Sequence, residues 1–526
     1  MSQISFHYLR DKDLGWLADA SQHWSTYADA LSDVHGDMQS KVAGAIVNSG
    51  WEGDASQSAA EICDELVLLF ETRRVRASAM ATVLSKGYDD ISQAQTSLRS
   101  TILKAENDGL TVADDGAVSA KDTEDDSKVA QYQKDINAYL EAARDADDRT
   151  ADALQDQSPS QPGYVAPDEL EDIGEDLREH LDLDPPPEGG SADDNAQWWQ
   201  DLSDEEREAY AYAYPEQIGF MDGVPSADRH VANMVTLRQD AQDGHDTGNA
   251  QELLDRVEKS QYGPDAERIF LLGYEPPGAD GSPDAKVIAA TGNPDTADNV
   301  AVFVPGVSTD LGSVDGNMDR LDDLRSEAEM VPGSGSTSTI LWLGYDPPDT
   351  IPGGIMPGPA NDAAPDLVSF TEGLRETHTG DSPAHNTVIG HSYGSTVVGT
   401  ADASGGQGTD DGLHTDDIIV LGSPGLGQES PERQGFLDGP MVDDVSDLHI
   451  AEDHFWAGAA GNDMVSYTQV HGNSPVDWSF GGQRISTEGA SGHSEYWDPD
   501  TESLRNQAYI VTGEYDQVDF VNRRFG

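Results

Sequence analysis

Residues 387–399 read Thr-Val-Ile-Gly-His-Ser-Tyr-Gly-Ser-Thr-Val-Val-Gly, and this stretch decides the fold. Its first three residues predict a strand, and residues 395–399 predict the start of a helix built from small side chains. Between them, Gly390, Ser392 and Gly394 form a Gly-x-Ser-x-Gly motif, and neither glycine has a side chain that would clash across a tight turn. A serine between a strand and a helix is typical of a nucleophile elbow, in which a strained turn exposes the hydroxyl. Ser392 is therefore the candidate nucleophile.

The rest of the C-terminal half repeats this alternation of strand and helix. Its apolar runs are continuous rather than alternating, which suits strands buried on both faces of a sheet. Strands that alternate with helices predict a mostly parallel α/β sheet flanked by helices. We expect strands at 269–272, 287–290, 300–304, 339–343, 387–389, 418–421 and 454–457, and helices at 314–329, 364–377, 394–402 and about 500–513.

A serine nucleophile needs a general base, and the base needs an acid that orients it. In hydrolases with this elbow, the acid and then the histidine follow the serine along the chain. Asp463 comes just past the predicted strand 454–457, at the carboxyl end where such an acid belongs, so we expect it to be the acid, with Asp477 as the alternative. Three other aspartates precede that strand and are less well placed: Asp443, Asp444 and Asp447.

Two histidines follow the expected acid. His493 lies in a loop directly before the predicted final helix, and we expect it to be the base. His471 is closer to Asp463 in sequence, and we interpret it as a loop histidine.

An attacked carbonyl also needs two N–H donors to stabilise the oxyanion that forms. One donor is expected from Tyr393, which directly follows the serine. The other is expected from the loop after the strand 300–304. Pro305 has no N–H, so Gly306 or Val307 is the expected donor.

The composition is strongly acidic. The chain has 526 residues, with 99 Asp and Glu against 30 Lys and Arg, which gives a formal net charge of −69. This balance argues against binding to nucleic acid or to anionic lipid, both of which need a basic face. The acidity suits either a protein kept soluble in high salt or an acidic proteome in general. The length allows two to four domains.

The sequence predicts neither a metal nor a cofactor. Cys63 is the single cysteine, so an intramolecular disulfide and a cysteine-based zinc cluster are excluded. The 14 histidines are scattered, without a His-x-x-x-His pair on a helical frame. No apolar run approaches the ~20 residues of a membrane span. The first residues lack a Sec-type signal, so we expect a cytoplasmic protein or one exported by a Sec-independent route.

The N-terminal region predicts a helical hairpin. Apolar residues recur at helical spacing over 11–48 and again over about 54–106, with a break at 48–50. Trp51 and Gly53 lie at the turn, where they resemble the WXG-type hairpins of type VII secretion substrates. The secretion tag of that family, Tyr followed four positions on by an acid, is not clearly present, since Ser92 follows Tyr88 at that distance.

The middle of the chain predicts mixed structure. Residues 110–118 predict a small β-hairpin, because Asp-Gly is a strong tight-turn pair, and 128–155 predicts a helix. Residues 156–195 are rich in Pro, Gly, Ser and acid and predict a linker, and helices return at about 196–260. The predicted domains are a hairpin at 1–112, a helix plus acidic linker at 113–195, a helical segment at 196–262 and an α/β domain at 263–526.

Several motifs are spread over the C-terminal three-fifths of the chain. Together they resemble the actinobacterial α/β-hydrolase family of unknown function. The resemblance implies an α/β-hydrolase fold after the all-α N-terminal region, with a Ser-Asp-His triad and an undefined substrate. The motifs are Asn195 to Trp199, Ile218 to Pro225, Phe303 to Gly306, Leu343 to Asp346, Gly390 to Gly394, Gly422 to Gly425 and Gly492 to Ser494.

The favoured hypothesis is a serine hydrolase that cleaves a carboxylic ester, from a small molecule or a lipid, through an acyl-enzyme on Ser392. An acyltransferase or a peptidase would use the same residues. The alternative is a non-catalytic module whose N-terminal hairpin self-associates, binds a partner or directs type VII-like export.

Overall fold

The computed structural model describes the chain as two compact units. It covers residues 4–47, 49–51, 53–120, 126–157, 169–181, 183–244, 248–279, 282–350, 353–380, 382–404, 412–429 and 440–521. The first unit comprises Met1–Pro185 and Ser203–Tyr214, and the second comprises Pro186–Leu202 and Pro215–Gly526. The chain therefore passes between the units three times. No described helix combines the length and the apolar character that a membrane span requires.

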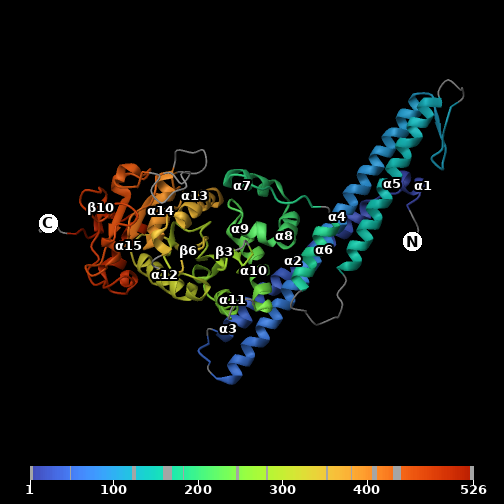
Figure 1. Ribbon diagram of the computed structural model, residues 1–526. Coiled ribbons are helices and arrows are strands. Elements are labelled where there is room, and N and C mark those ends of the chain that lie inside the picture. Colours follow the sequence, from blue (N-terminus) through green and yellow to red (C-terminus); the bar gives the residue numbers. More distant parts are fainter. Residues whose placement is uncertain are drawn as a thin grey trace. The chain divides into compact units, whose positions relative to one another are not determined.

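The first unit is built on three long helices (Figure 1). Helix α2 (Gly15–Asp37), a π-helical turn and α3 (Gly44–Val47) are followed by α4 (Asp54–Asn107), and α2 packs along α4. The third helix, α5 (Asp126–Asp156), packs along α4 as well. Short helix α1 (Phe6–Asp11) precedes them, and β1 (Thr111–Val112) pairs antiparallel with β2 (Val118–Ser119). The predicted helices and the small β-hairpin are thus present.

One helix lies where the sequence predicts only linker. Helix α6 (Glu169–His180) buries Leu170, Ile173 and Leu177, which recur at three- and four-residue spacing. This apolar stripe is short, and the acidic residues between its members make the segment look polar when it is judged by composition alone. The prediction of a linker over all of 156–195 is therefore wrong for this part.

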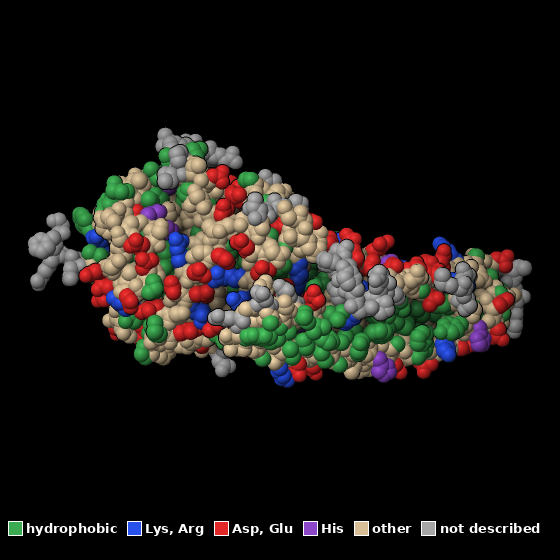
Figure 2. Space-filling model, turned by 90° about the horizontal axis from the view of Figure 1, so that it is seen from below, with side chains coloured by type: hydrophobic (Ala, Val, Ile, Leu, Met, Phe, Trp, Pro, Cys, Tyr) green, Lys and Arg blue, Asp and Glu red, His purple; other side chains and the backbone are tan. Residues whose placement is uncertain are grey.

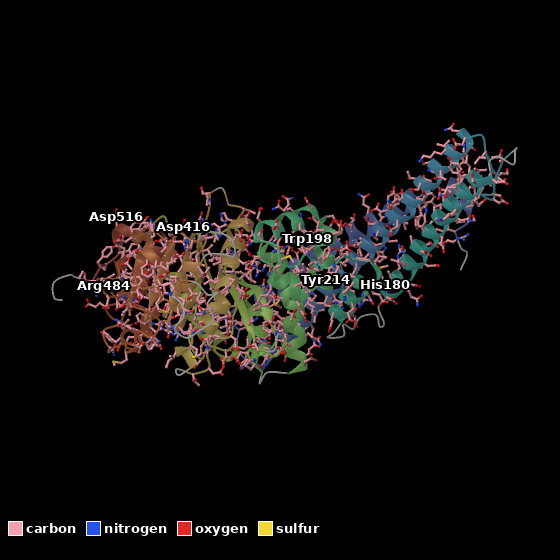
Figure 3. The ribbon with its side chains drawn as sticks, turned by 45° about the horizontal axis from the view of Figure 1, so that its top comes forward. His180, Trp198, Tyr214, Asp416, Arg484 and Asp516 are labelled. Atoms are coloured by element: carbon pink, nitrogen blue, oxygen red, sulfur yellow. The ribbon has the colours of Figure 1, made fainter. Side chains whose placement is uncertain are left out.

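Helix α8 (Asp204–Ala213) belongs to the first unit although α7 (Ala192–Asp201) before it belongs to the second. Glu208 of α8 forms an ion pair with Arg74 of α4. Figure 3 labels two further side chains near this packing, His180 of α6 and Tyr214, whose hydroxyl donates to the carbonyl oxygen of Leu183 at 3.1 Å.

The second unit is organised around an eight-stranded sheet in the order β10-β9-β8-β7-β5-β6-β4-β3. Six neighbouring strands, from β10 to β6, are parallel, and β4 and β3 add an antiparallel edge. The fold is therefore the predicted mostly parallel α/β arrangement. The strands are β3 (Ile269–Glu275), β4 (Lys286–Thr291), β5 (Asn299–Val304), β6 (Thr337–Leu343), β7 (His385–His391), β8 (Asp417–Leu421), β9 (Phe455–Gly458) and β10 (Gln483–Arg484).

Helices flank this sheet in packed pairs (Figure 1). Helix α12 (Val314–Glu329) packs on β6 and against α15 (Glu502–Val511). Helix α13 (Gly358–Thr377) packs against α14 (Tyr393–Ser404), which follows β7 directly. The remaining helices of this unit are α9 (Pro215–Phe220), α10 (Ser226–Asp243) and α11 (Asn249–Ser260), and α10 covers β3.

Two of the sequence motifs stabilise this unit rather than forming a reactive site. The amide of Asn195 donates to the carbonyl oxygen of Asp222 at 3.0 Å, and the indole of Trp199 donates to Asp228 at 2.9 Å. The carboxylate of Asp222 pairs with buried Arg229 at 3.0 Å. A buried ion pair must satisfy its remaining donors and acceptors. The Ser369 hydroxyl donates to the Asp222 carboxylate at 2.7 Å, and Arg229 Nε donates to the carbonyl oxygen of Gly219 at 3.1 Å.

Candidate active site

The Gly-x-Ser-x-Gly turn joins β7 to α14 with Ser392 at its apex. Ser392 has a φ of 55°, in the left-handed region of backbone conformation. This conformation is unfavourable in free energy for any residue that has a side chain. Its backbone N–H donates to the carbonyl oxygen of Leu421 at 3.0 Å. A Cβ atom at Gly394 would collide with the carbonyl oxygen of Val304 in β5, so only glycine permits this approach of helix to strand. Packing and hydrogen bonding together hold the strained turn.

Ser392, His493 and Asp463 form one chain of hydrogen bonds. His493 Nε2 lies 2.8 Å from Ser392 Oγ. On the other side of the ring, His493 Nδ1 lies 2.8 and 2.9 Å from the two carboxylate oxygens of Asp463. A carboxylate only accepts hydrogen bonds, so Nδ1 carries the proton and Nε2 accepts from the serine hydroxyl. The structure therefore brings together the three side chains predicted as nucleophile, base and acid.

Asp463 lies fully buried just beyond β9, at the carboxyl edge of the sheet. Burial raises the pKa of this carboxyl, but hydrogen bonds from His493 and from the Tyr496 hydroxyl outweigh burial and hold the pKa below its usual range. The Tyr496 hydroxyl donates at 2.6 Å, and the backbone N–H of Val465 donates at 2.9 Å. The carboxylate thus stays charged in a buried position.

His391, the variable residue before the serine, contacts the base. Its Nε2 donates to the backbone carbonyl oxygen of His493 at 2.7 Å, and the two rings lie 4.7 Å apart between centroids. Burial lowers the pKa of His391 to about 3, and the neighbouring His493 and Arg320 contribute to the shift. His391 is therefore neutral, and it fixes the backbone that carries His493.

A cavity of about 530 Å³ opens at Ser392. The residues predicted for the oxyanion hole, Tyr393, Gly306 and Val307, all line it, as does His493. A Cβ atom at Gly306 would lie 2.8 Å from the Cβ of Ser392 and 3.0 Å from the Tyr393 nitrogen, so the loop after β5 lies directly against the elbow. Backbone donors from both segments therefore border the space next to the serine hydroxyl.

The alternative residues lie elsewhere. His471 is buried and its Nε2 donates to the carbonyl oxygen of Gly354 at 2.6 Å, and burial lowers its pKa. Asp477, the alternative acid, accepts a hydrogen bond from Gln469 at 3.2 Å and does not line the cavity. The earlier aspartates do not line the cavity either, and they accept hydrogen bonds elsewhere: Asp443 from Asn473, Asp444 from Ser446, and Asp447 from the backbone of Asp443 and Asp444.

Sequence reasoning did not single out Tyr496, Asn317 or Arg320. Tyr496 lies three residues after His493, and nothing in its local pattern indicates that its hydroxyl reaches Asp463. Asn317 and Arg320 lie on α12, whose bounds the sequence predicts correctly, and both line the cavity. Periodicity predicts where a helix runs, but which of its polar residues face a cavity depends on tertiary packing.

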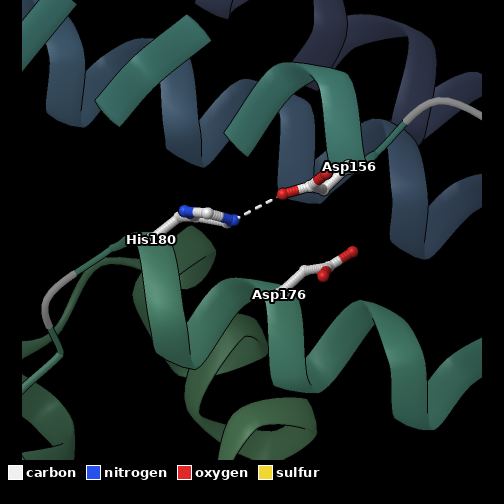
Figure 4. Close-up of side chains that lie close together, drawn as sticks. All are labelled: Asp156, Asp176 and His180. Atoms are coloured by element: carbon white, nitrogen blue, oxygen red, sulfur yellow. Dashed lines mark hydrogen bonds and ion pairs between the residues drawn. The ribbon is translucent and has the colours of Figure 1, made fainter. Parts of the chain in front are cut away.

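One group of described side chains has a spacing that could hold a metal ion. Asp156 at the end of α5 lies beside Asp176 and His180 of α6, with ligand atoms within 4.8 Å of one another (Figure 4). His180 Nε2 is bonded to an Asp156 oxygen at 2.6 Å. Burial raises the pKa of Asp176, and the charge of Asp156 adds to this effect. The histidine–aspartate pair accounts for the arrangement without a cation, and we assign this group no function.

Comparisons with known proteins match the part of the chain that carries Ser392 and Asp463. The model of a family described as alpha/beta hydrolase matches residues 280–472, which include Ser392 and Asp463 and end before His493. An uncharacterized protein of Mycobacterium tuberculosis, Rv2079, is 28% identical over 82% of this chain and 75% of its own length.

A second uncharacterized protein of that species, Rv0963c, is 33% identical over 36% of this chain and 73% of its own length, as is Mb0988c of Mycobacterium bovis. No solved structure matches. The chain therefore belongs to one family with these uncharacterized mycobacterial proteins, and its residues 280–472 match the alpha/beta hydrolase family model.

Proposed function

We propose that the second unit is a serine hydrolase that cleaves a carboxylic ester. The observation that carries this proposal is the unbroken chain of hydrogen bonds from Ser392 through His493 to Asp463, at the wall of a cavity. A buried, charged carboxylate behind the histidine is the arrangement that makes a serine hydroxyl nucleophilic.

In the first half of the reaction, Ser392 Oγ attacks the ester carbonyl and its proton passes to His493 Nε2. The tetrahedral intermediate collapses, and the alcohol leaves with that proton. In the second half, His493 takes a proton from water, and this water attacks the acyl-enzyme. The second tetrahedral intermediate collapses, His493 returns the proton to Ser392 Oγ, and the carboxylic acid leaves. Asp463 stabilises the imidazolium each time it forms. The N–H groups of Tyr393 and of Gly306 or Val307 hold the oxyanion.

A fluorophosphonate probe tests the proposal directly, because it labels serines that an adjacent base activates. We expect labelling at Ser392 and hydrolysis of 4-nitrophenyl esters, with both lost in Ser392→Ala, at a cost of ~10⁴-fold or more in turnover. The matched control is Ser446→Ala, since Ser446 is an exposed turn residue that does not line the cavity. Full ester hydrolysis by Ser392→Ala would contradict the assignment.

The same residues would serve an acyltransferase, in which an alcohol or amine replaces water in the second half of the reaction. The two functions share the acyl-enzyme and differ in the acceptor. A series of esters of increasing acyl length, assayed with and without added alcohol acceptors, separates them. Transfer that exceeds hydrolysis at low acceptor concentration would favour the acyltransferase.

The first unit supports a second proposal, that its helical hairpin self-associates or binds a partner helix pair. Hydrophobic side chains gather along one face of the helical unit (Figure 2). On α4, Ile62 is 58% exposed and Leu66, one turn later, is 36% exposed. Exposed apolar patches of this kind mark interaction sites. Type VII-like export would rest on the resemblance around Trp51 and Gly53 alone.

Sedimentation of the full chain tests this second proposal. We expect an assembly larger than the monomer, or a partner captured by the purified chain, and a monomer for the double variant Ile62→Asp with Leu66→Asp. If the wild-type chain is monomeric and binds no partner, the second proposal is wrong and the exposed apolar face is not an interaction site.

A further inference from the structure

The cavity at Ser392 differs in charge from the rest of the protein. Asp and Glu supply 99 of the 526 residues of the chain. Among the described residues that line this cavity there is no Asp or Glu, and the charged side chain there is Arg320. A cavity without carboxylates in so acidic a chain is suited to an anion, which the surface elsewhere repels.

Arg320 belongs to a polar stripe on one face of α12. Asn317 and Arg320 of α12 are three residues apart and lie on one side of the helix, and Ser313 precedes the helix as its N-cap. All three residues line the cavity. The other lining residues near the serine are largely apolar, among them Val307 and Val465. The cavity thus combines apolar walls with one polar, positively charged strip.

The guanidinium of Arg320 is oriented by two neighbours. Its Nη1 donates to Asn317 Oδ1 at 2.9 Å, and Asn317 Nδ2 donates in turn to the carbonyl oxygen of Ser313 at 3.0 Å. The guanidinium carbon lies 5.8 Å from the ring centroid of Trp497. These contacts restrict the side chain while leaving most of its five N–H donors available.

Arg320 has no carboxylate partner among the described residues, unlike three other arginines of this unit. Arg229 pairs with Asp222, Arg375 with Asp416, and Arg256 with three aspartates of α12. A half-buried guanidinium without a counter-ion is an unsatisfied charge, and a carboxylate would bond it with two parallel hydrogen bonds.

We propose that the substrate is an ester that also carries a carboxylate, and that Arg320 binds this carboxylate while Ser392 attacks the ester. The inference rests on the proposed function and names its substrate class. One guanidinium balances one carboxylate charge, whereas a phosphate dianion would call for more positive charge than this cavity offers. The apolar walls then hold the carbon chain between the two groups.

The test compares two substrates with acyl groups of equal length, mono-4-nitrophenyl glutarate, which carries a carboxylate, and 4-nitrophenyl pentanoate, which does not. We expect wild-type protein to favour the glutarate ester in kcat/KM. In Arg320→Gln this ratio should fall by about 10- to 100-fold, the loss typical of a charge-assisted hydrogen bond. Arg320→Lys should keep part of the preference.

Two further variants keep the result interpretable. Asn317→Asp places a carboxylate beside Arg320 and should abolish the preference without removing the arginine. Arg505→Gln makes the same change in net charge at an arginine that does not line the cavity, and it should keep the wild-type ratio. Inorganic phosphate that inhibits more strongly than glutarate, or a ratio unchanged in Arg320→Gln, would overturn the carboxylate inference.

The failure of this inference is distinguishable from that of the proposed function. Ser392-dependent hydrolysis of both esters with no effect of Arg320→Gln overturns the role of Arg320 alone. Absence of hydrolysis of either ester, together with absence of fluorophosphonate labelling at Ser392, overturns the hydrolase proposal and this inference with it.

Discussion

At the scale of single residues, the charge of Asp463 depends on donors contributed by other segments. Tyr496 and the Val465 N–H bond its carboxylate, so the negative charge is retained although the side chain is buried. A carboxylate so placed keeps Nδ1 of His493 protonated, which leaves Nε2 to accept the serine proton. The tautomer of the histidine is thus determined by Asp463.

We therefore expect Asp463→Asn to fold and to lose activity by about 10⁴-fold, because an amide can donate to Nδ1 and stabilise the wrong tautomer. Asp477→Asn should change kcat little, since Asp477 bonds Gln469 outside the cavity. Steady-state kinetics of both variants, with far-UV circular dichroism to check folding, measures this. The opposite ranking of the two kcat values would make Asp477 the acid.

The burial of His391 should make the free energy of unfolding depend on pH. An imidazole in the unfolded chain has a pKa of about 6.5. In the fold, burial lowers the pKa of His391 to about 3, with His493 adding to the effect. As pH falls below about 6.5, the unfolded chain binds a proton that the folded chain does not bind until about pH 3, so this residue lowers the free energy of unfolding across that window.

We expect His391→Gln to lose less stability than wild type as pH falls from 7 to about 4.5. The difference in free energy of unfolding between the variant and wild type should change by on the order of 1 kcal/mol per pH unit below about pH 6.5. This is the maximum slope that one proton can give. Urea unfolding at a series of pH values measures the free energies. Parallel pH profiles of the two proteins would show that His391 takes up its proton in the fold.

Some of the candidate site residues can be predicted from the sequence and others cannot. Ser392, Asp463 and His493 follow from motif, strand ends and chain order, and the structure brings them within hydrogen-bond distance. Tyr496 and Arg320 could not be predicted this way, because their roles depend on side-chain directions set by packing between α12, α15 and the sheet.

At the scale of elements, the elbow depends on how closely α14 approaches β5. A Cβ at Gly394 would collide with backbone, whereas a Cβ at Gly316 in α12 would meet nothing within 4 Å. We expect Gly394→Ala to lower the melting temperature and fluorophosphonate labelling. Gly316→Ala should raise stability by about 0.5–1 kcal/mol, since alanine favours a helix over glycine. Thermal unfolding of both variants measures the contrast, and equal effects of the two would contradict it.

The prediction of strands and helices from sequence is correct where apolar runs are long and wrong where they are short. The seven expected strands are present because strands buried on both faces of a sheet are continuously apolar. The two-residue strand β10 carries Gln483 and Arg484, which give no apolar signal. Strand β9 begins at Phe455 rather than at His454, which belongs to a 3₁₀ turn. Helix α6 was missed because acidic residues surround its three buried leucine and isoleucine side chains.

At the scale of the whole molecule, composition and packing divide the chain differently. The predicted boundaries at 112, 195 and 262 follow shifts in composition. The two units instead assign Pro186–Leu202 to the sheet-containing unit and Ser203–Tyr214 to the helical one. A segment rich in acid and proline is predicted as linker from its composition even where part of it forms a packed helix, and this is the case for α6, whose Ile173 is buried.

This division predicts how the chain can be cut. A fragment of residues 186–526 keeps α7 and every residue proposed for the site, so we expect Ser392 to be labelled by fluorophosphonate at a rate close to that of the full chain. A fragment of residues 215–526 lacks α7, and with it the bonds from Asn195 to Asp222 and from Trp199 to Asp228, so it should melt at a lower temperature and label more slowly. In the longer fragment α8 loses its contacts with α4 and α6 of the first unit. Equal melting temperatures and labelling rates for the two fragments would show that α7 contributes nothing to the second unit, and would place its boundary after Tyr214.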